Sequence, residues 1–373
     1  MSSLTQTSKR FKKGLKLFFL AALVYYTSIL FIIPRSQHLI KMIFPDKDPP
    51  TIAFGKMPQL QFEAKEITGN EPTIALNTKS GRLPTDLATK MRVFAFVPPE
   101  FSYFARQNAE DAANFLGFSE SELTTDLKAS AYRWRSLQSG GILEINIDNN
   151  NLTLDTDLFG KASQYRAGTI TMSRAQEVAT KLFLGVKRLD DKRYVTGEKT
   201  VHLGKFLGNT LLETNTERDA QIAKVDFFRN LGEHKVLGPD PQVGLLQAWV
   251  GNPARISNPY NYPYVKAYYH EVDTTSNATY PVLDVNTAWK AVKGGQGVIA
   301  NISAKEANPF EEYKPARVDS IRIDNIYLAY YETPTAQKYL QPIYVFEGNF
   351  SSRGTQGGQI TIYLPAVSGD YVE

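Results

Sequence analysis

The sequence contains no cysteine. The chain therefore has no disulfide, no thiolate metal ligand and no cysteine nucleophile, and its fold depends on packing alone. Domains secreted by animal cells usually carry disulfides. If a chain of this length works outside the cytoplasm, its lack of cysteine favours a bacterial envelope as its location.

Motifs that bind cofactors or carry out a reaction are also absent. The four histidines, His38, His202, His234 and His270, stand singly and lack the spacing of a metal site, so we expect surface or core-rim roles. Neither G-x-S-x-G nor S-x-x-K occurs, and the GGQGV run follows a predicted helix without the lysine of a phosphate-binding loop. We expect no cofactor, no metal and no catalytic residue.

An excess of positive charge is missing from most of the chain. Seven of the basic residues lie in positions 1–41, where no acid occurs, so subtracting them from the formal net charge of +4 leaves −3 for residues 46–373. A nucleic-acid binder needs a basic surface to neutralise phosphates. We therefore expect no nucleic-acid partner.

A long apolar run, Leu17 to Ile33 (LFFLAALVYYTSILFII), contains no charged residue. At 1.5 Å per residue, a helix over 15–34 just spans a bilayer core of roughly 30 Å. The anchoring side chains are Leu17, Phe18, Phe19, Leu20, Leu23, Val24, Ile29, Leu30, Phe31, Ile32 and Ile33. The run favours a transmembrane helix over a cleaved signal peptide, which has a shorter core and small residues after it, and over a buried core helix.

Five basic residues precede the apolar run, and two follow it before the first acid. Basic flanks stay on the cytoplasmic side, so residues 1–14 form a cytoplasmic tail and the C-terminal part lies outside the membrane. We predict a single-pass protein of the cytoplasmic membrane. The residues that set this topology are Lys9, Arg10, Lys12, Lys13 and Lys16.

The remaining chain has an α+β pattern. Residues 35–90 are rich in proline, which indicates edge strands or an extended stalk. Three units then follow, each with a short helix packed on an antiparallel sheet: 91–160, 161–270 and 271–373. Ser102, the capping box SRAQ at Ser173, and Asp284 are the expected helix starts, and Gly117, Gly185 and Gly294 are the expected ends. Ala175, Val178, Ala179 and Leu182 form the apolar stripe of the second helix.

Tyrosines and paired acids are the remaining candidate site residues. The tyrosines Tyr260, Tyr262, Tyr264, Tyr268 and Tyr269 fit either a partner surface or ordinary packing. The acid pairs Glu311 and Glu312, Asp190 and Asp191, and Asp155 and Asp157 fit a solvated surface better than a glycosidase pair.

The last unit resembles a known group of proteins. The stretches YPVLDVNTAWKAVKGGQGVI and VDSIRIDNIYLAYYETPTAQKYLQPIYVFEG resemble the PepSY-like and YycH/YycI-like regulatory proteins of bacterial envelopes, with the best agreement from about residue 220 onward. The resemblance implies modules that bind another protein, such as a sensor kinase or a peptidase, and it supplies no catalytic residue.

The sequence therefore favours a membrane-anchored, non-enzymatic interaction protein with an envelope protein as its partner. Two alternatives stay open: an envelope hydrolase that acts on cell-wall glycan or peptide, and a structural subunit of a secretion or pilus machine. A hydrolase would bring two buried carboxyl groups to a cleft, roughly 5 to 9.5 Å apart.

Overall fold

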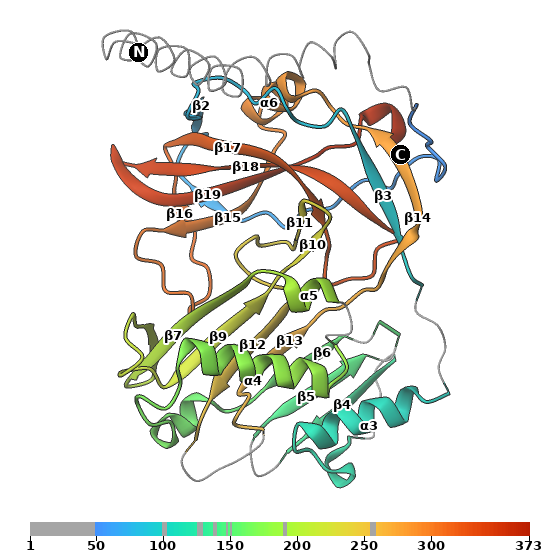
Figure 1. Ribbon diagram of the computed structural model, residues 1–373. Helices are drawn as coiled ribbons and strands as arrows, with labels where there is room; N and C mark the ends of the chain where they lie inside the picture. The colour runs from blue at the N-terminus through green and yellow to red at the C-terminus, as the bar shows by residue number, and fades with distance from the viewer. Residues whose placement is uncertain are drawn as a thin grey trace, which may run out of the picture. The chain divides into compact units, whose positions relative to one another are not determined.

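The computed structural model describes residues 49–98, 103–124, 130–136, 140–146, 148–149, 151–188, 192–253 and 259–373. The chain divides into two units, Met1–Thr51 and Ile52–Glu373, and almost all described residues belong to the second. This second unit is built on two large sheets (Figure 1). The predicted α+β class is confirmed.

The first large sheet has eight antiparallel strands in the order β4-β5-β6-β13-β12-β9-β7-β8. The pairing of β6 with β13 joins the two expected units 91–160 and 161–270 into one sheet. The strands are β4 (Ala131–Arg135), β5 (Ile142–Asn146), β6 (Leu152–Asp155), β7 (Lys199–Leu207), β8 (Thr210–Glu213), β9 (Ile222–Phe227), β12 (Leu246–Gly251) and β13 (Tyr264–Ala267).

Helices α3 (Ala105–Phe115) and α4 (Met172–Gly185) lie on one face of this sheet (Figure 1). The predicted stripe on α4 is buried at Ala175, Ala179 and Leu182. The α4 N-cap is Thr171, whose hydroxyl accepts a hydrogen bond from the Arg174 amide, so the box predicted at Ser173 begins two residues too late. Shorter helices are α5 (Lys192–Thr196) and the 3₁₀ turns Glu120–Glu122, Phe159–Gln164 and Gly369–Tyr371.

The second large sheet has nine strands, and its main path runs β10-β11-β17-β18-β19-β15. Antiparallel pairs dominate, but β2 and β11 pair with β17 in parallel. Its strands are β2 (Thr73–Leu76), β3 (Lys90–Phe96), β10 (Arg229–Leu231), β11 (His234–Leu237), β14 (Val272–Pro281), β15 (Val298–Ala304), β17 (Ser320–Tyr331), β18 (Tyr339–Ser352) and β19 (Thr355–Pro365). A separate parallel pair joins β1 (Ile67–Thr68) to β16 (Ala316–Arg317).

Helix α6 (Val285–Lys293) follows the predicted start closely. The Asp284 carboxylate accepts hydrogen bonds from the amides of Asn286 and Thr287, and Gly294 is the C-cap. Ala288 and Val292 are buried, and the helix contacts β19. The sequence signals for this helix are therefore confirmed at both ends.

Strand β3 and the β10-β11 hairpin join a different part of the fold from the one predicted. Strand β3 was expected to open the first unit, but it pairs with β14 and β18 because its apolar residues complete the core of the nine-stranded sheet. The β10-β11 hairpin, expected in the second unit, extends the same sheet.

The described part of the expected stalk, from residue 49, also belongs to the fold. Met57 and Leu60 are buried in apolar clusters, and β2 pairs with β17, so of the two readings of 35–90 the edge strand is the one observed at Thr73–Leu76. Met57 forms a parallel bridge with Val372. The prolines in this segment keep its strands short, but they do not keep it apart from the fold. Burial of the neighbouring apolar side chains holds the segment against the sheet.

The predicted membrane helix over 15–34 lies outside the described residues, as do the basic residues before it. Within the described ranges, no helix is both long enough and apolar enough to span a bilayer.

A candidate binding cleft

The face of the eight-stranded sheet opposite the helices carries a grid of polar and aromatic side chains. Alternate residues of each strand point to this face, while their neighbours fill the core beneath α3 and α4. Strand pairing aligns the grid in two rows. One row is Thr200, Asp226, Gln247, Lys266 and Thr153, and the other is His202, Lys224, Trp249, Tyr264 and Asp155.

A polar face of this kind normally faces water in an antiparallel sheet. Here the middle of the grid is covered, because Asp226, Lys224 and Gln247 are 0%, 7% and 5% exposed. Residues of the β15–β16 segment pack over part of it. These covered polar side chains therefore need hydrogen-bond partners, because burying them without such partners is costly.

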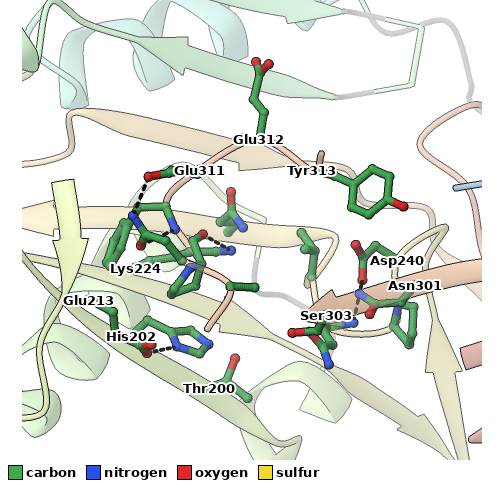
Figure 2. A pocket seen from close by; sticks show the side chains of 18 of the residues that line it. Thr200, His202, Glu213, Lys224, Asp240, Asn301, Ser303, Glu311, Glu312 and Tyr313 are labelled. Atoms are coloured by element: carbon green, nitrogen blue, oxygen red, sulfur yellow. Dashed lines mark hydrogen bonds and ion pairs between the residues drawn. The ribbon is translucent and has the colours of Figure 1, made fainter. Parts of the chain in front are cut away.

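A cleft of about 1630 Å³ lies over this face. Its other wall comes from β15, from the loop after β11, and from residues 304–314 (Figure 2). In the figure, Thr200, His202 and Glu213 lie on the grid side, and Asp240, Asn301 and Ser303 lie on the β15 side. The volume exceeds the range of about 300–1,000 Å³ that holds a small molecule.

The charges on the cleft wall nearly balance. Six lysines and seven acids line it, and His202 adds a titratable group. None of these acids is buried, since each is exposed or, for Asp240, half-buried. A wall of mixed sign suits a ligand that carries both polar groups and charges of both signs.

Asp226 is the central buried acid beneath the cleft. Its Oδ1 accepts hydrogen bonds from the Gly244 amide at 3.0 Å and from Gln247 Nε2 at 2.7 Å. Its Oδ2 has no hydrogen-bond partner, and Lys224 Nζ lies 3.8 Å away. Burial raises the pKa of Asp226, and the neighbouring Lys224 charge opposes that rise only in part.

Other polar atoms around the cleft also lack partners. Thr200 Oγ1, Trp249 Nε1 and Asn301 Oδ1 are buried without a hydrogen bond. Such atoms are rare in folded proteins because each carries a desolvation cost. On the β15 side, Asn301 Nδ2 donates to Asp240 Oδ1 at 2.6 Å, and Lys65 Nζ lies 3.5 Å from Asp240 Oδ2.

The structure does not gather the five predicted tyrosines on one surface. Tyr260 is 5% exposed and packs with Tyr165, whereas Tyr264 lines the cleft. Tyr262 and Tyr269 pack against the core on the helix side, and burial raises the pKa of Tyr268. Of the two readings, packing describes most of them, and Tyr264 alone of the five contributes to the cleft.

The acid pairs are also separated by role. Glu311, Glu312 and Asp155 are exposed on the cleft wall, and partial desolvation of the Asp155 carboxyl by the surrounding residues raises its pKa. Asp157 accepts a hydrogen bond from the Gly160 amide. Asp190 and Asp191 lie outside the described residues.

The three histidines in the described ranges have different neighbours. His202 Nδ1 lies 2.8 Å from Glu213 Oε1, His234 is next to the Leu328 carbonyl, and His270 is next to Glu332. Within the described ranges, no three His, Asp or Glu side chains are grouped as metal ligands would be. His38 lies outside those ranges.

The cleft residues were missed from sequence because alternation predicts only which face of a strand they share. The signal that was present is the repeated polar-apolar order in β7, β9, β12 and β13. Nothing in that order shows that residues 304–314, which begin 37 to 97 positions after these strands end, would cover the polar face.

Comparison with known proteins does not assign this chain to a family. The sequence matches no protein-family description and no curated protein. Among solved structures, a crystal structure of an uncharacterized protein from Eubacterium rectale ATCC 33656 matches with a TM-score of 0.43 and 11% identity. That match covers 77% of this chain and 86% of the other, and a score of this size does not establish a shared fold.

Proposed function

We propose that this chain is a non-enzymatic interaction protein of a bacterial envelope, anchored by residues 15–34, whose cleft binds a segment of a protein partner. The observation that carries the proposal is the cleft itself, which is large, has a mixed polar and apolar lining, and carries charges of both signs. Its size excludes few polymers, but its charge balance disfavours nucleic acid, which requires a basic wall. A sensor kinase or a peptidase fits the partner that the sequence resemblance implies.

A protein segment is favoured over glycan because the sheet side of the cleft already binds polypeptide, namely the segment 304–314 that forms part of the opposite wall. A turn of the chain's own 304–314 segment is hydrogen-bonded to β8 and β9. The walls thus complement backbone carbonyls and side-chain amides. An interaction of this kind requires no catalytic residue.

The hydrolase alternative receives less support from the arrangement of acids. Two carboxylates of the described chain are 0% exposed, Asp226 and Glu332, and Glu332 forms an ion pair with Arg229 away from the cleft. The acids on the wall are not buried. Hydrolysis would have been favoured by two acids that are buried and also line the cleft wall.

Photo-crosslinking in intact bacterial cells tests the proposal. A photoreactive amino acid replaces Glu312 on the cleft wall, or Leu184, which is 51% exposed on α4 on the other face of the sheet. We expect illumination to give a discrete adduct with one envelope protein from position 312 and none from position 184. Equal adducts from both positions, or none from 312, would contradict the proposal. A ladder of self-adducts would favour the structural-subunit alternative.

A further inference from the structure

A tight turn, Asn308–Pro309–Phe310–Glu311, forms part of the cleft wall opposite the eight-stranded sheet. The Glu311 amide donates to the Asn308 carbonyl at 3.0 Å, and the Phe310 amide donates to Asn308 Oδ1 at 3.3 Å. Proline in the second position of such a turn fixes its φ, and asparagine in the first caps it. The turn is thus held by its own sequence and presents Phe310 and the Pro309 carbonyl.

The eight-stranded sheet binds this turn at three points. Lys224 Nζ donates to the Pro309 carbonyl at 3.2 Å, and Asn308 Nδ2 donates to the Leu211 carbonyl at 2.7 Å. The Phe310 ring meets Trp249 edge to face, with ring centroids 5.4 Å apart. We call this place, formed by Gly204, Leu211, Lys224 and Trp249, the aromatic seat.

Gly204 shapes the aromatic seat. A Cβ atom at that position would lie 2.8 Å from Phe310 Cζ and 3.0 Å from Leu211 Cδ1. The ring therefore rests against bare backbone in the middle of β7. A side chain in this position would close the seat, because real Cβ contacts do not occur at such distances.

The turn fills the aromatic seat incompletely. Phe310 remains half-buried, and the indole nitrogen of Trp249 has no hydrogen-bond partner. Lys224 donates to the Pro309 carbonyl, while Asp226 Oδ2, 3.8 Å from the Lys224 ammonium, accepts no hydrogen bond. The internal turn thus leaves hydrogen-bonding atoms in and beside the aromatic seat unsatisfied, and a ligand that pairs with them would gain binding energy.

We propose that the aromatic seat is the anchor subsite for the partner, which presents a turn with an aromatic side chain and displaces Asn308–Glu311. The inference rests on the proposed function, since it names what enters the same cleft. Lys224 binds a backbone carbonyl of the incoming turn as it now binds that of Pro309. Because the internal turn competes, the apparent affinity for the partner is reduced by the fraction of molecules in which the seat is open.

The test uses the chain's own turn as the probe. A fluorescein-labelled peptide KEANPFEEYK, residues 305–314, is titrated with the full-length chain in detergent micelles, and anisotropy reports binding. We expect Phe310→Ala, which empties the seat, to bind the probe at least about 10-fold more tightly than the unchanged chain. Phe159→Ala is the matched control, because Phe159 also lines the cleft but lies outside the seat.

Two further controls address specificity. The peptide KEANPAEEYK, which lacks the aromatic ring, should not bind Phe310→Ala. Adding Gly204→Leu to Phe310→Ala should abolish binding, because leucine would fill the seat. If Phe310→Ala unfolds, Asn308→Ala replaces it; this change removes the bond to Leu211 and should raise affinity in the same direction.

Equal binding of the probe to the unchanged chain and to the opened variant would overturn the inference, as would equal binding of the two peptides or no binding at all. The proposed function fails separately. A cellular adduct from position 312 without probe binding would support the proposed function and contradict the role of the aromatic seat as its anchor subsite. Probe binding without any adduct would support the aromatic seat and contradict the proposed function.

Discussion

Arg229 and Glu332 form an ion pair that is cut off from solvent. Arg229 Nη2 lies 2.6 Å from Glu332 Oε2, and the two side chains are 2% and 0% exposed. The same nitrogen donates to the His270 carbonyl at 3.0 Å, and the guanidinium lies over the ring of Tyr194. The chain leaves the eight-stranded sheet at the end of β9 and enters the nine-stranded sheet at Arg229, the first residue of β10. The pair ties this point of entry to Glu332, which follows β17.

Removing one partner of this pair should be costly. We expect Glu332→Gln to lower the free energy of unfolding by about 3–5 kcal/mol, because it leaves the arginine charge buried and unpaired. Urea unfolding followed by tryptophan fluorescence measures the change. The control is Glu144→Gln, which breaks an exposed pair with Arg133 and should cost less than about 1 kcal/mol. A loss as small as the control's would contradict this view of the pair.

Asp226→Asn should stabilise the protein at neutral pH. Burial raises the pKa of Asp226 in the folded state, so the folded state binds its proton more tightly than the unfolded state does. Stability then falls as pH rises from the unfolded pKa, about 3.9, through the folded pKa. The variant should gain about 1–3 kcal/mol over the unchanged chain at pH 7, and the gain should shrink as pH falls towards 4.

Thermal unfolding at pH 4 to 8 measures this effect. Asp273→Asn is a control of opposite sign, because hydrogen bonds from Thr275 lower the pKa of that exposed carboxyl. Its replacement should decrease stability at pH 7, and this loss should persist down to about pH 4, since it shrinks only below the unfolded pKa. A pH-independent difference for Asp226→Asn would show that charge burial is not its cause.

The cap of α6 gives a third prediction. Hydrogen bonds from Thr287 and Asn286 lower the pKa of Asp284, so its contribution is present above the unfolded pKa and is lost as pH falls through the folded pKa. Asp284→Ala should cost about 1 kcal/mol in urea unfolding at pH 7. Asp284→Asn keeps the capping acceptor and should cost less. Equal losses would assign the effect to charge instead of to the hydrogen bonds.

The predicted topology can be tested directly in cells. A reporter enzyme that is active only outside the cytoplasm, fused after Glu373, should be active because Lys9, Arg10, Lys12, Lys13 and Lys16 keep the N-terminus inside. Neutralising these five residues together should lower the reporter activity. Protease added to intact spheroplasts should digest residues 35–373. A silent reporter with a protected C-terminal part would overturn the predicted location of the cleft.

Local signals in the sequence predicted the elements better than their assembly. Asp284 and Gly294 bound α6 as predicted because caps depend on residues within one turn. The alternating pattern of β7 and β9 predicted strands with one apolar face. By contrast, β3 and β14 pair across about 180 positions, and no local pattern carries that information.

The candidate site was harder to predict than the fold. Lys224 and Asp226 look like residues of a solvated face, and only the distant turn at Phe310 shows that this face is partly covered. The five tyrosines are close in sequence, and this closeness was the basis for considering them as one partner surface. Their strands and loops carry them to different sides of the sheet, so closeness in sequence was a poor guide to a shared surface.

The bridge between Met57 and Val372 has a consequence for biosynthesis. The Met57 amide donates to the Tyr371 carbonyl at 2.7 Å, and the Glu373 amide donates to the Met57 carbonyl at 2.9 Å. Residues near the start of the folded unit thus have no complete partner until residue 373 has been made. At about 5–20 residues per second, translation of the intervening chain takes roughly 15–60 s. The segment around Met57 would stay open for that interval, and chaperones that bind unfolded chain would meet it before the core closes.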